Sequence, residues 1–354
     1  MKKIILFLFT ILTVFSSCNN YMDDEKVSDE YITFKTDGFL EATTRGATIT
    51  AANMTSFGVS AAVYPAANSY TTAACGQYFH DIEVSAESGT CGYFWPGSDY
   101  RMAFYAYAPY GDDALTVGSA ETTGHPIYSY TVPTAIASQL DFVTASVTNN
   151  PGTKTETPVA LSFSHKCAAL RFHITNDNTT AITITSVGVY GVKYTGTYKE
   201  DRTPKWVLTG SANTTESHPF LLTLNTSLAA GADSEITGTS NQFILLPQTV
   251  AAGTDNFILQ TIEDGIAYSY TYTLPSNMTV EQGTSFTYNI VIKDKKMYVD
   301  PDTNVSDWDT TNASGSGSVS NWWYTDAQYL WTVTDWNNNG SSNSGNSIEN
   351  WEEN

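Results

Sequence analysis

Two residues near the start of the chain, Cys18 and Arg45, have the type and setting that covalent processing requires. Cys18 follows Ser16-Ser17 at the end of an apolar run over residues 4–15, which is shorter than the ~20 residues of a membrane-spanning helix. Such a run is typical of a signal-peptide core, and a cysteine behind small residues is the pattern in which bacteria acylate the thiol. We therefore predict a lipoprotein signal peptide over residues 1–17 and lipidation of Cys18. An ordinary secretory signal that contains a cysteine is the alternative.

Arg45 is a single basic residue between Thr43-Thr44 and Gly46, a polar, small-residue setting in which a trypsin-like protease could cut between Arg45 and Gly46. The segment that this cut would release, residues 18–45, contains the strand-like Tyr31-Ile32-Thr33-Phe34. It also carries acidic residues just after Cys18, which resemble a surface-export tag or form a solvated tether. Cleavage would therefore remove a strand together with its anchor.

Other chemistry finds little support in the sequence. His165, Cys167 and His173 suggest a metal site, but the two histidines fall on different predicted strands and no carboxylate cluster lies near them. The chain contains no nucleophile elbow, zincin, phosphate-loop or dinucleotide-binding motif. We expect no metal, no cofactor and no catalytic residue, and so do not predict an enzyme.

The charge of the chain argues against nucleic-acid binding. The net charge is −20 at pH 7. Residues 1–45 hold five basic and seven acidic side chains, so the remaining 11 basic and 29 acidic residues still give −18. An acidic surface of this kind repels phosphate backbones and anionic membranes.

Three cysteines remain after Cys18. In an exported protein, Cys75 and Cys91 could form a disulfide. Cys167 lies in an apolar strand and is best interpreted as a small buried hydrophobic residue.

Nearly all strong hydrophobic patterns have period two, which predicts strands with one buried face. Apolar residues alternate with small or polar ones over residues 159–164, 169–174, 266–274 and 286–293. No stretch of comparable length has apolar residues at helical spacing. The fold class predicted is therefore all-β, with turns rich in Gly, Asn and Pro.

The strands divide at a polar break, Asn176-Asp177-Asn178, with Asn149-Asn150-Pro151-Gly152 as a second candidate. We place the boundary at the first break, because residues 159–163 and 170–174 read as neighbouring strands of one sandwich. The predicted organisation is a signal peptide (1–17), an acylated tether with a pro-strand (18–45), an N-terminal sandwich (46–176), a C-terminal sandwich (177–310) and a tail (311–354).

The tail combines flexible Ser/Gly/Asn-rich runs with an aromatic island that includes Trp322, Trp323, Trp331 and Trp336. A strand-like piece on a flexible tether cannot bury its own side chains, so it needs a groove elsewhere. Two other interpretations stay open. The tryptophans could pack onto the second sandwich, or they could stack on sugar rings in a non-polymerising glycan-binding surface lipoprotein.

The order of several stretches resembles the fimbrillin-like family of pilus subunits, the Mfa-like branch of type V pili. In chain order they are the lipoprotein signal, Thr44-Arg45, Phe57-Gly58-Val59, Trp95-Pro96, Met102-Ala103-Phe104-Tyr105-Ala106-Tyr107-Ala108-Pro109, Gln139-Leu140-Asp141-Phe142-Val143-Thr144-Ala145, Pro158-Val159-Ala160-Leu161-Ser162-Phe163-Ser164-His165-Lys166-Cys167-Ala168-Ala169-Leu170-Arg171-Phe172, Ile244-Leu245-Leu246-Pro247-Gln248 and Val305-Ser306-Asp307-Trp308. Two features depart from the family pattern: the sequence after His165 and the long tail beyond Trp308. The tail leaves the roles of stalk, tip and anchor subunit open.

The resemblance implies two tandem transthyretin-like β-sandwiches and export as an outer-membrane lipoprotein. It also implies cleavage after the arginine by an arginine-specific protease, and polymerisation with other pilus subunits by donor-strand exchange. Vacating an edge slot exposes unpaired backbone groups until another chain supplies a strand, and head-to-tail contacts of this kind build a filament. The donor predicted in this sequence is a tail strand, with residues 297–305 as the alternative. The residues of the predicted donor are Tyr329, Leu330, Trp331, Thr332, Val333 and Thr334.

Overall fold

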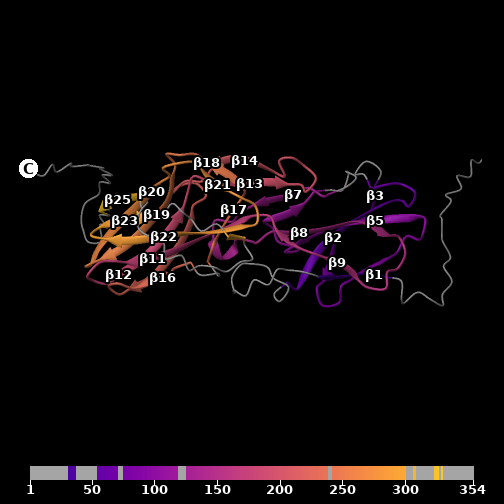
Figure 1. The fold of residues 1–354 in the computed structure, drawn as a ribbon, viewed down its shortest axis with the longest axis horizontal. Helices are drawn as coiled ribbons and strands as arrows, with labels where there is room; N and C mark the ends of the chain where they lie inside the picture. Colours follow the sequence, from indigo (N-terminus) through magenta and orange to yellow (C-terminus); the bar gives the residue numbers. More distant parts are fainter. Residues whose placement is uncertain are drawn as a thin grey trace, which may run out of the picture.

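The computed structural model describes residues 31–36, 54–70, 75–118, 125–237 and 241–299, and the backbone of short strands at 306–307, 323–326 and 328–329. Within this part of the chain the secondary structure is strands and one 3-10 turn, η3 (Ile136–Ser138), so the predicted all-β class is confirmed. The molecule is elongated, with the early strands at one end and the late strands at the other (Figure 1). No helix in the described part has the length and apolar character needed to cross a membrane.

Two sheets pack around a first core at one end of the molecule. The larger sheet has the order β10-β8-β5-β2-β3 and the smaller one the order β4-β1-β9. Buried residues from both sheets, among them Phe34, Phe57, Phe104 and Leu161, form this first core. The strands are β1 (Tyr31–Thr36), β2 (Ser56–Pro65), β3 (Gly76–Ser85), β4 (Thr90–Phe94), β5 (Tyr100–Ala108), β8 (Val143–Pro151), β9 (Val159–Leu161) and β10 (Ser164–His165).

A second, larger core lies between two further sheets, with the orders β16-β11-β22-β23-β25 and β15-β12-β19-β20-β26. In the first of these, β17 also pairs with β11, and β24 with β22. Their strands are β11 (Ala168–Asn176), β12 (Ile182–Val189), β15 (Phe220–Leu228), β16 (Asp233–Glu235), β17 (Phe243–Leu245), β19 (Asp255–Glu263), β20 (Ile266–Thr273), β22 (Thr284–Lys293), β23 (Lys296–Val299), β24 (Ser306–Asp307), β25 (Trp323–Asp326) and β26 (Gln328–Tyr329).

Two smaller sheets complete the fold. One has the order β14-β13-β7-β6 and the other pairs β18 with β21. The first joins the halves of the chain, because β7 precedes the first core's last strands and pairs with β13, which follows them. The strands are β6 (Leu115–Val117), β7 (Tyr128–Thr131), β13 (Lys193–Tyr198), β14 (Trp206–Ala212), β18 (Gln248–Val250) and β21 (Met278–Val280).

The residues that alternate with period two in the sequence lie on the buried faces of these sheets. In β20 the tyrosines at 268, 270 and 272 are all buried in the second core. Strand β11 is buried on both faces over its first five residues, and it pairs in parallel with β22. Strands of parallel sheets that are covered on both faces are almost continuously apolar. The apolar sequence of β11 therefore reflects its central place in the second core.

The predicted pairing of residues 159–163 with 170–174 is wrong. Strand β9 pairs with β1, whereas β11 pairs with β22. The chain leaves the first core's sheets after β10 and joins the sheets of the second core with β11. Periodicity identified both strands correctly, but it holds no information on which distant strand each one meets. The domain boundary after residue 176 stays a prediction.

Candidate functional site

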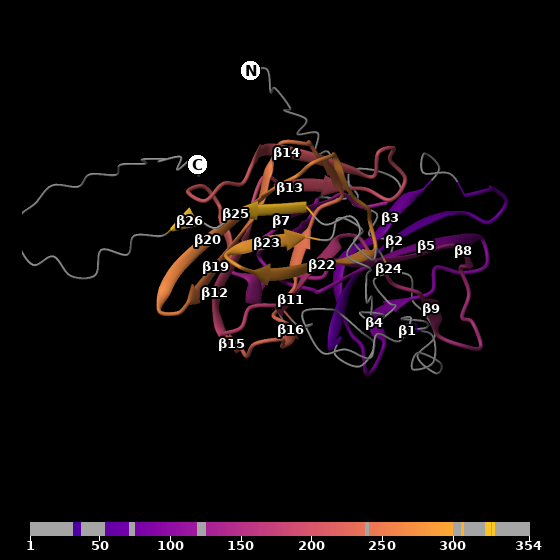
Figure 2. The ribbon, with the colours of Figure 1, turned by 60° about the vertical axis from the view of Figure 1, so that its left-hand side comes forward.

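The candidate site is the position of β1 between β4 and β9, which we call the β1 slot. Strand β1 pairs antiparallel with β4, where Tyr31 lies opposite Phe94, and in parallel with β9, where Phe34 lies opposite Val159. Figure 2 shows the three strands side by side. The expectation of an edge slot is wrong, because this segment before the predicted cleavage site is the central strand of its sheet.

Buried and more exposed side chains alternate along β1, so one face of the strand fits against the first core. Ile32 is 0% exposed and Phe34 is 4% exposed, while Lys35 is exposed. The Phe34 ring packs edge to face on Phe104 at 5.1 Å between centroids and on Phe57 at 6.4 Å. Emptying the slot would remove two large apolar side chains from the first core, at a cost of about 2–5 kcal/mol each.

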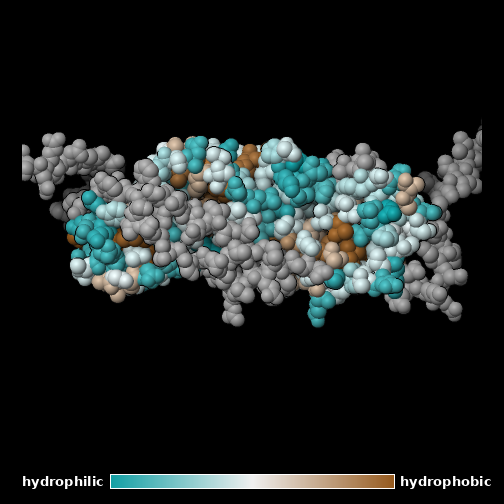
Figure 3. All heavy atoms as spheres, in the orientation of Figure 1, coloured by the Kyte–Doolittle hydropathy of each residue, from teal (hydrophilic) through white to brown (hydrophobic). Residues whose placement is uncertain are grey.

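The outer side of the slot is aromatic as well. Tyr31 stacks on Phe94 with 4.5 Å between ring centroids and 22° between ring planes. Beside β2 and β9, a patch of hydrophobic residues is exposed at the surface and is bordered by more hydrophilic residues (Figure 3). Departure of β1 would therefore uncover Phe94 on one side and the first core on the other.

The backbone of β1 forms hydrogen bonds with the β3–β4 turn and with β4. The Phe34 amide donates to the Gly89 carbonyl at 2.8 Å, and the Cys91 thiol lies 3.5 Å from the Ile32 carbonyl. Burial raises the pKa of the Cys91 thiol. A vacated slot would leave the Gly89 carbonyl without this amide donor, and buried backbone groups without partners are destabilising.

The processing residues Cys18, Arg45 and Gly46 lie outside the described residues. The chain order alone places β1 between Cys18 and Arg45. A cut after Arg45 would therefore leave β1 on the acylated fragment, separate from the sheets that hold it. Cleavage and anchoring stay predictions.

The tail strands pair with the sheets of the second core. β25 pairs with β23, and β26 pairs with β20, so that each tail strand is the outermost strand of its sheet (Figure 2). Of the predicted donor, only Tyr329 falls within the described backbone, in β26. The residues from Leu330 to Thr334 lie outside it.

The alternative donor begins inside the second core. Met297 and Val299 are both 0% exposed, in a strand that pairs with β22 on one side and β25 on the other. To become a donor, β23 would have to leave this core. The site therefore favours a donor from farther along the tail.

The suggested disulfide between Cys75 and Cys91 is not formed, and both residues are buried thiols. Cys91 lies in the first core with Phe104, whereas Cys75 packs with Tyr105 in a separate cluster. Phe104 and Tyr105 are adjacent in β5, so their side chains point to opposite faces of the sheet. The sheet itself separates the two sulfurs.

The histidines that suggested a metal site have carboxylate partners of their own. His165 Nδ1 lies 2.8 Å from Asp141 Oδ1, and His173 Nε2 lies 3.0 Å from Asp233 Oδ2. Within the described residues, no group of three metal-ligating side chains comes together. A histidine and one carboxylate supply two ligands, fewer than the three or four protein ligands of a zinc site.

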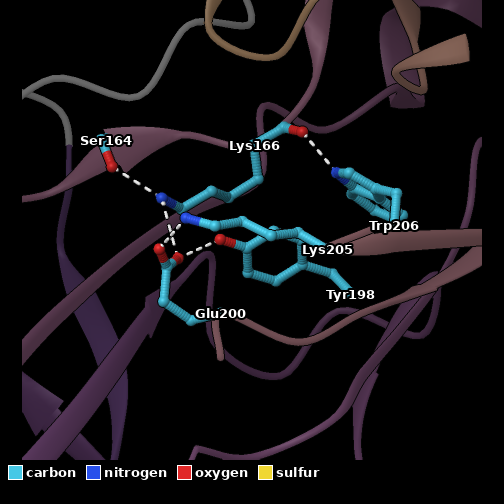
Figure 4. A network of polar contacts seen from close by, with 6 residues as sticks. All are labelled: Ser164, Lys166, Tyr198, Glu200, Lys205 and Trp206. Carbon is cyan, nitrogen blue, oxygen red and sulfur yellow. Dashed lines mark hydrogen bonds and ion pairs between the residues drawn. The ribbon is translucent and has the colours of Figure 1, made fainter. Parts of the chain in front are cut away.

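A polar network that the sequence patterns did not predict lies where the chain passes between the two cores (Figure 4). The buried Lys166 ammonium lies 3.4 Å from Glu200 and donates to Ser164 Oγ at 2.7 Å. Lys205 and Tyr198 also donate to Glu200. The Trp206 indole donates to the Lys166 carbonyl at 2.7 Å, so the hairpin of β13 and β14 is tied to β10. A lysine within an apolar strand region was the available signal.

Burial and charge oppose each other in this network. Burial lowers the pKa of Lys166, and Glu200 counteracts this. Burial alone would raise the pKa of Glu200, but hydrogen bonds from Lys205 and Tyr198 and the charge of Lys166 outweigh it and lower the pKa to about 2. The ionised carboxylate therefore stabilises this junction.

Comparisons with known proteins identify chains of similar fold and the family of this chain. A crystal structure of a fimbrial protein from Bacteroides vulgatus ATCC 8482 is similar, with a TM-score of 0.55, 18% identity, and coverage of 79% of this chain and 99% of that chain. A proposed cell adhesion protein from Bacteroides ovatus ATCC 8483 gives a TM-score of 0.44, 20% identity, and coverage of 78% and 96%. No curated protein matches the chain. The family model described as fimbrillin-like matches residues 32–322, so the chain belongs to the fimbrillin-like family.

Proposed function

We propose that this protein is a structural and adhesive subunit of a type V pilus that assembles by donor-strand exchange. The observation that carries the proposal is the place of β1. It pairs with both β4 and β9, buries Ile32 and Phe34, and precedes Arg45 in the chain. A strand that is both central to its sheet and removable by one cut keeps a subunit closed until processing.

The proposed route begins with a lipoprotein precursor. Acylation of Cys18 would hold it at the outer membrane, with β1 filling its own slot. In this form the first core is complete and the chain is monomeric. We propose that the precursor reaches the cell surface before an arginine-specific protease acts.

Cleavage between Arg45 and Gly46 would then separate β1 from the body. The slot would expose unpaired groups on β4 and β9 together with the pockets of Ile32 and Phe34. A strand from a second subunit would fill it by main-chain hydrogen bonds and alternate side chains. Because donor and slot lie on different parts of the chain, each addition leaves another slot and another donor, and a filament grows.

The tail is the proposed source of the donor. Strands β25 and β26 are the outermost strands of the second core's sheets, so their release would leave the buried strands β22 and β19 in place. The donor segment, residues 329–334, starts at the end of β26. Adhesion to a host or bacterial surface would follow from the assembled fibre.

The test is a protease-triggered ladder of polymers on a gel. Full-length protein treated with an arginine-specific protease should give the ladder, and Arg45→Ala should stay at the mobility of the precursor. Deletion of residues 320–354 should abolish the ladder while the body remains folded by circular dichroism. Polymers of unchanged length after the deletion would contradict the tail as donor. Glycan-array binding by a monomer that never polymerises would favour the sugar-binding alternative.

A further inference from the structure

Gly89 is the point where the β3–β4 turn touches the backbone of β1. It adopts a positive φ of +66°. Its amide donates to the Ser85 carbonyl at 2.8 Å, and its carbonyl accepts from the Phe34 amide at 2.8 Å. The turn is thus fixed on one side to β3 and on the other to the occupant of the slot.

A side chain at this position would collide with that occupant. A Cβ atom built on Gly89 would lie 2.0 Å from the Phe34 carbonyl oxygen and 3.1 Å from its carbonyl carbon. Both atoms belong to backbone, which cannot rotate away as a flexible side chain can. The peptide of Phe34 therefore lies where only a glycine leaves room.

Gly92, three residues along, provides a matched comparison. Its φ is +76°, and a Cβ atom built on it meets nothing within 4 Å. Substitution of either glycine carries the strain of a side chain in the left-handed region. Only substitution of Gly89 adds contact with β1.

We propose that Gly89 is the positioning residue of the β1 slot, which determines whether a strand can seat between β4 and β9. This inference rests on the proposed function, in which a strand from a second subunit fills the slot after β1 has left. The contact with Gly89 involves only backbone atoms of the occupant. Any strand that follows the path of β1, including one from a second subunit, presents a carbonyl at the same place. Gly89 therefore governs acceptance of a strand, whereas donation depends on a different part of the chain.

The slot also defines the class of strand that it accepts. The occupant runs parallel to β9 and antiparallel to β4. It presents apolar side chains inward at two alternate positions, those of Ile32 and Phe34, the second against the rings of Phe57 and Phe104. A strand with a charged residue at either inward position would not seat, because burying an unpaired charge is strongly unfavourable.

The Cys91 thiol reports on slot occupancy without any need for polymerisation. It contacts the Ile32 carbonyl and is 7% exposed, so loss of β1 uncovers it. The experiment compares maleimide labelling of full-length wild type, Gly89→Ala and Gly92→Ala, with each cysteine followed by peptide mass spectrometry. We expect Cys91 to react at least about tenfold faster in Gly89→Ala than in Gly92→Ala, as local opening of the slot requires. Equal rates in the two variants would overturn the proposal.

Cys167, which is 0% exposed in the second core, shows whether a variant has unfolded as a whole. If Gly89→Ala exposes Cys167 too, the pair Gly89→Asn and Gly92→Asn replaces it, because asparagine tolerates a positive φ while retaining the Cβ atom. Faster labelling of Cys91 with Cys167 protected supports the inference. Exposure of both thiols in both Gly89 variants, with the Gly92 variants folded, would assign Gly89 to folding instead and overturn it.

A mixing experiment separates this inference from the proposed function. Protease-treated Gly89→Ala subunits should still donate a strand but not accept one, so adding them to wild type should shorten the ladder. Gly92→Ala should leave its length unchanged. If treated wild type gives no ladder at all, the proposed function fails, while the labelling comparison still decides the role of Gly89 at the slot.

Discussion

The Phe34 ring in β1 meets the Phe104 ring in β5 edge to face, with 5.1 Å between their centroids. One ring belongs to the strand that processing is proposed to remove, and the other to the sheet that stays. Pairs of this geometry contribute about 0.5–1.5 kcal/mol beyond the burial of their area. This contact therefore links the stability of the precursor to the occupancy of the slot.

Phe34→Ala should destabilise the first core by about 3–5 kcal/mol, because it leaves a cavity between β1 and β5. The measurement is urea unfolding of the full-length precursor, with Cys91 labelling as a local readout. Lys35→Ala, at an exposed position on the same strand, is the control and should change the free energy of unfolding by no more than about 0.5 kcal/mol. A loss in Phe34→Ala as small as that expected for the control would show that β1 contributes little through its inward face.

How much of this site the sequence could predict depends on which interactions are local. Alternation in Tyr31-Ile32-Thr33-Phe34 predicted β1, and alternation in residues 266–274 predicted β20, because a half-buried strand has period two whatever its partners. The place of β1 as a central strand did not follow from the pattern. It depends on pairing with β9, more than a hundred residues away in sequence.

The polar network was not predicted, and the disulfide prediction is wrong, for the same reason. Lys166 and Glu200 come together only because the β13–β14 hairpin packs against β10, a contact with no local signature. Cys75 and Cys91 are close in sequence, yet β5 lies between them. Spacing along the chain does not tell which face of a sheet a side chain occupies.

Glu200→Gln should destabilise the protein at neutral pH by roughly 1–3 kcal/mol, because Lys166 loses its charged partner. The folded-state pKa of Glu200 is lowered to about 2. Its contribution is therefore complete above the ordinary carboxyl pKa and is lost as the pH falls from about 4.5 toward 2. Urea unfolding across this range should show the difference between wild type and variant shrinking with acidity. Glu216→Gln, at an exposed carboxylate, is the control and should show no such convergence.

Reducing agent should not change the thermal unfolding midpoint of the protein, because Cys75 and Cys91 are thiols on opposite faces of a sheet. Loss of a native disulfide costs about 2–5 kcal/mol, which would lower the midpoint by several degrees. The measurement is differential scanning calorimetry with and without reductant, supported by the intact mass after alkylation. A lower midpoint in reductant would restore the disulfide interpretation.

The alternation of the tail predicts which of its faces enters a neighbouring slot. In a strand over residues 329–334, Trp331 and Val333 would share one face and Leu330 and Thr332 the other. The slot requires two apolar residues at alternate inward positions. Trp331→Asp and Val333→Asp should therefore reduce the protease-triggered ladder at least about tenfold, because a buried unpaired charge is strongly unfavourable.

Thr332→Asp, on the opposite face of the same strand, is the matched control and should polymerise like wild type. Circular dichroism of the uncut variants checks that the body stays folded. Polymerisation lost only in Thr332→Asp would reverse the assignment of faces, and polymerisation unaffected in all three would exclude these residues from the donor strand.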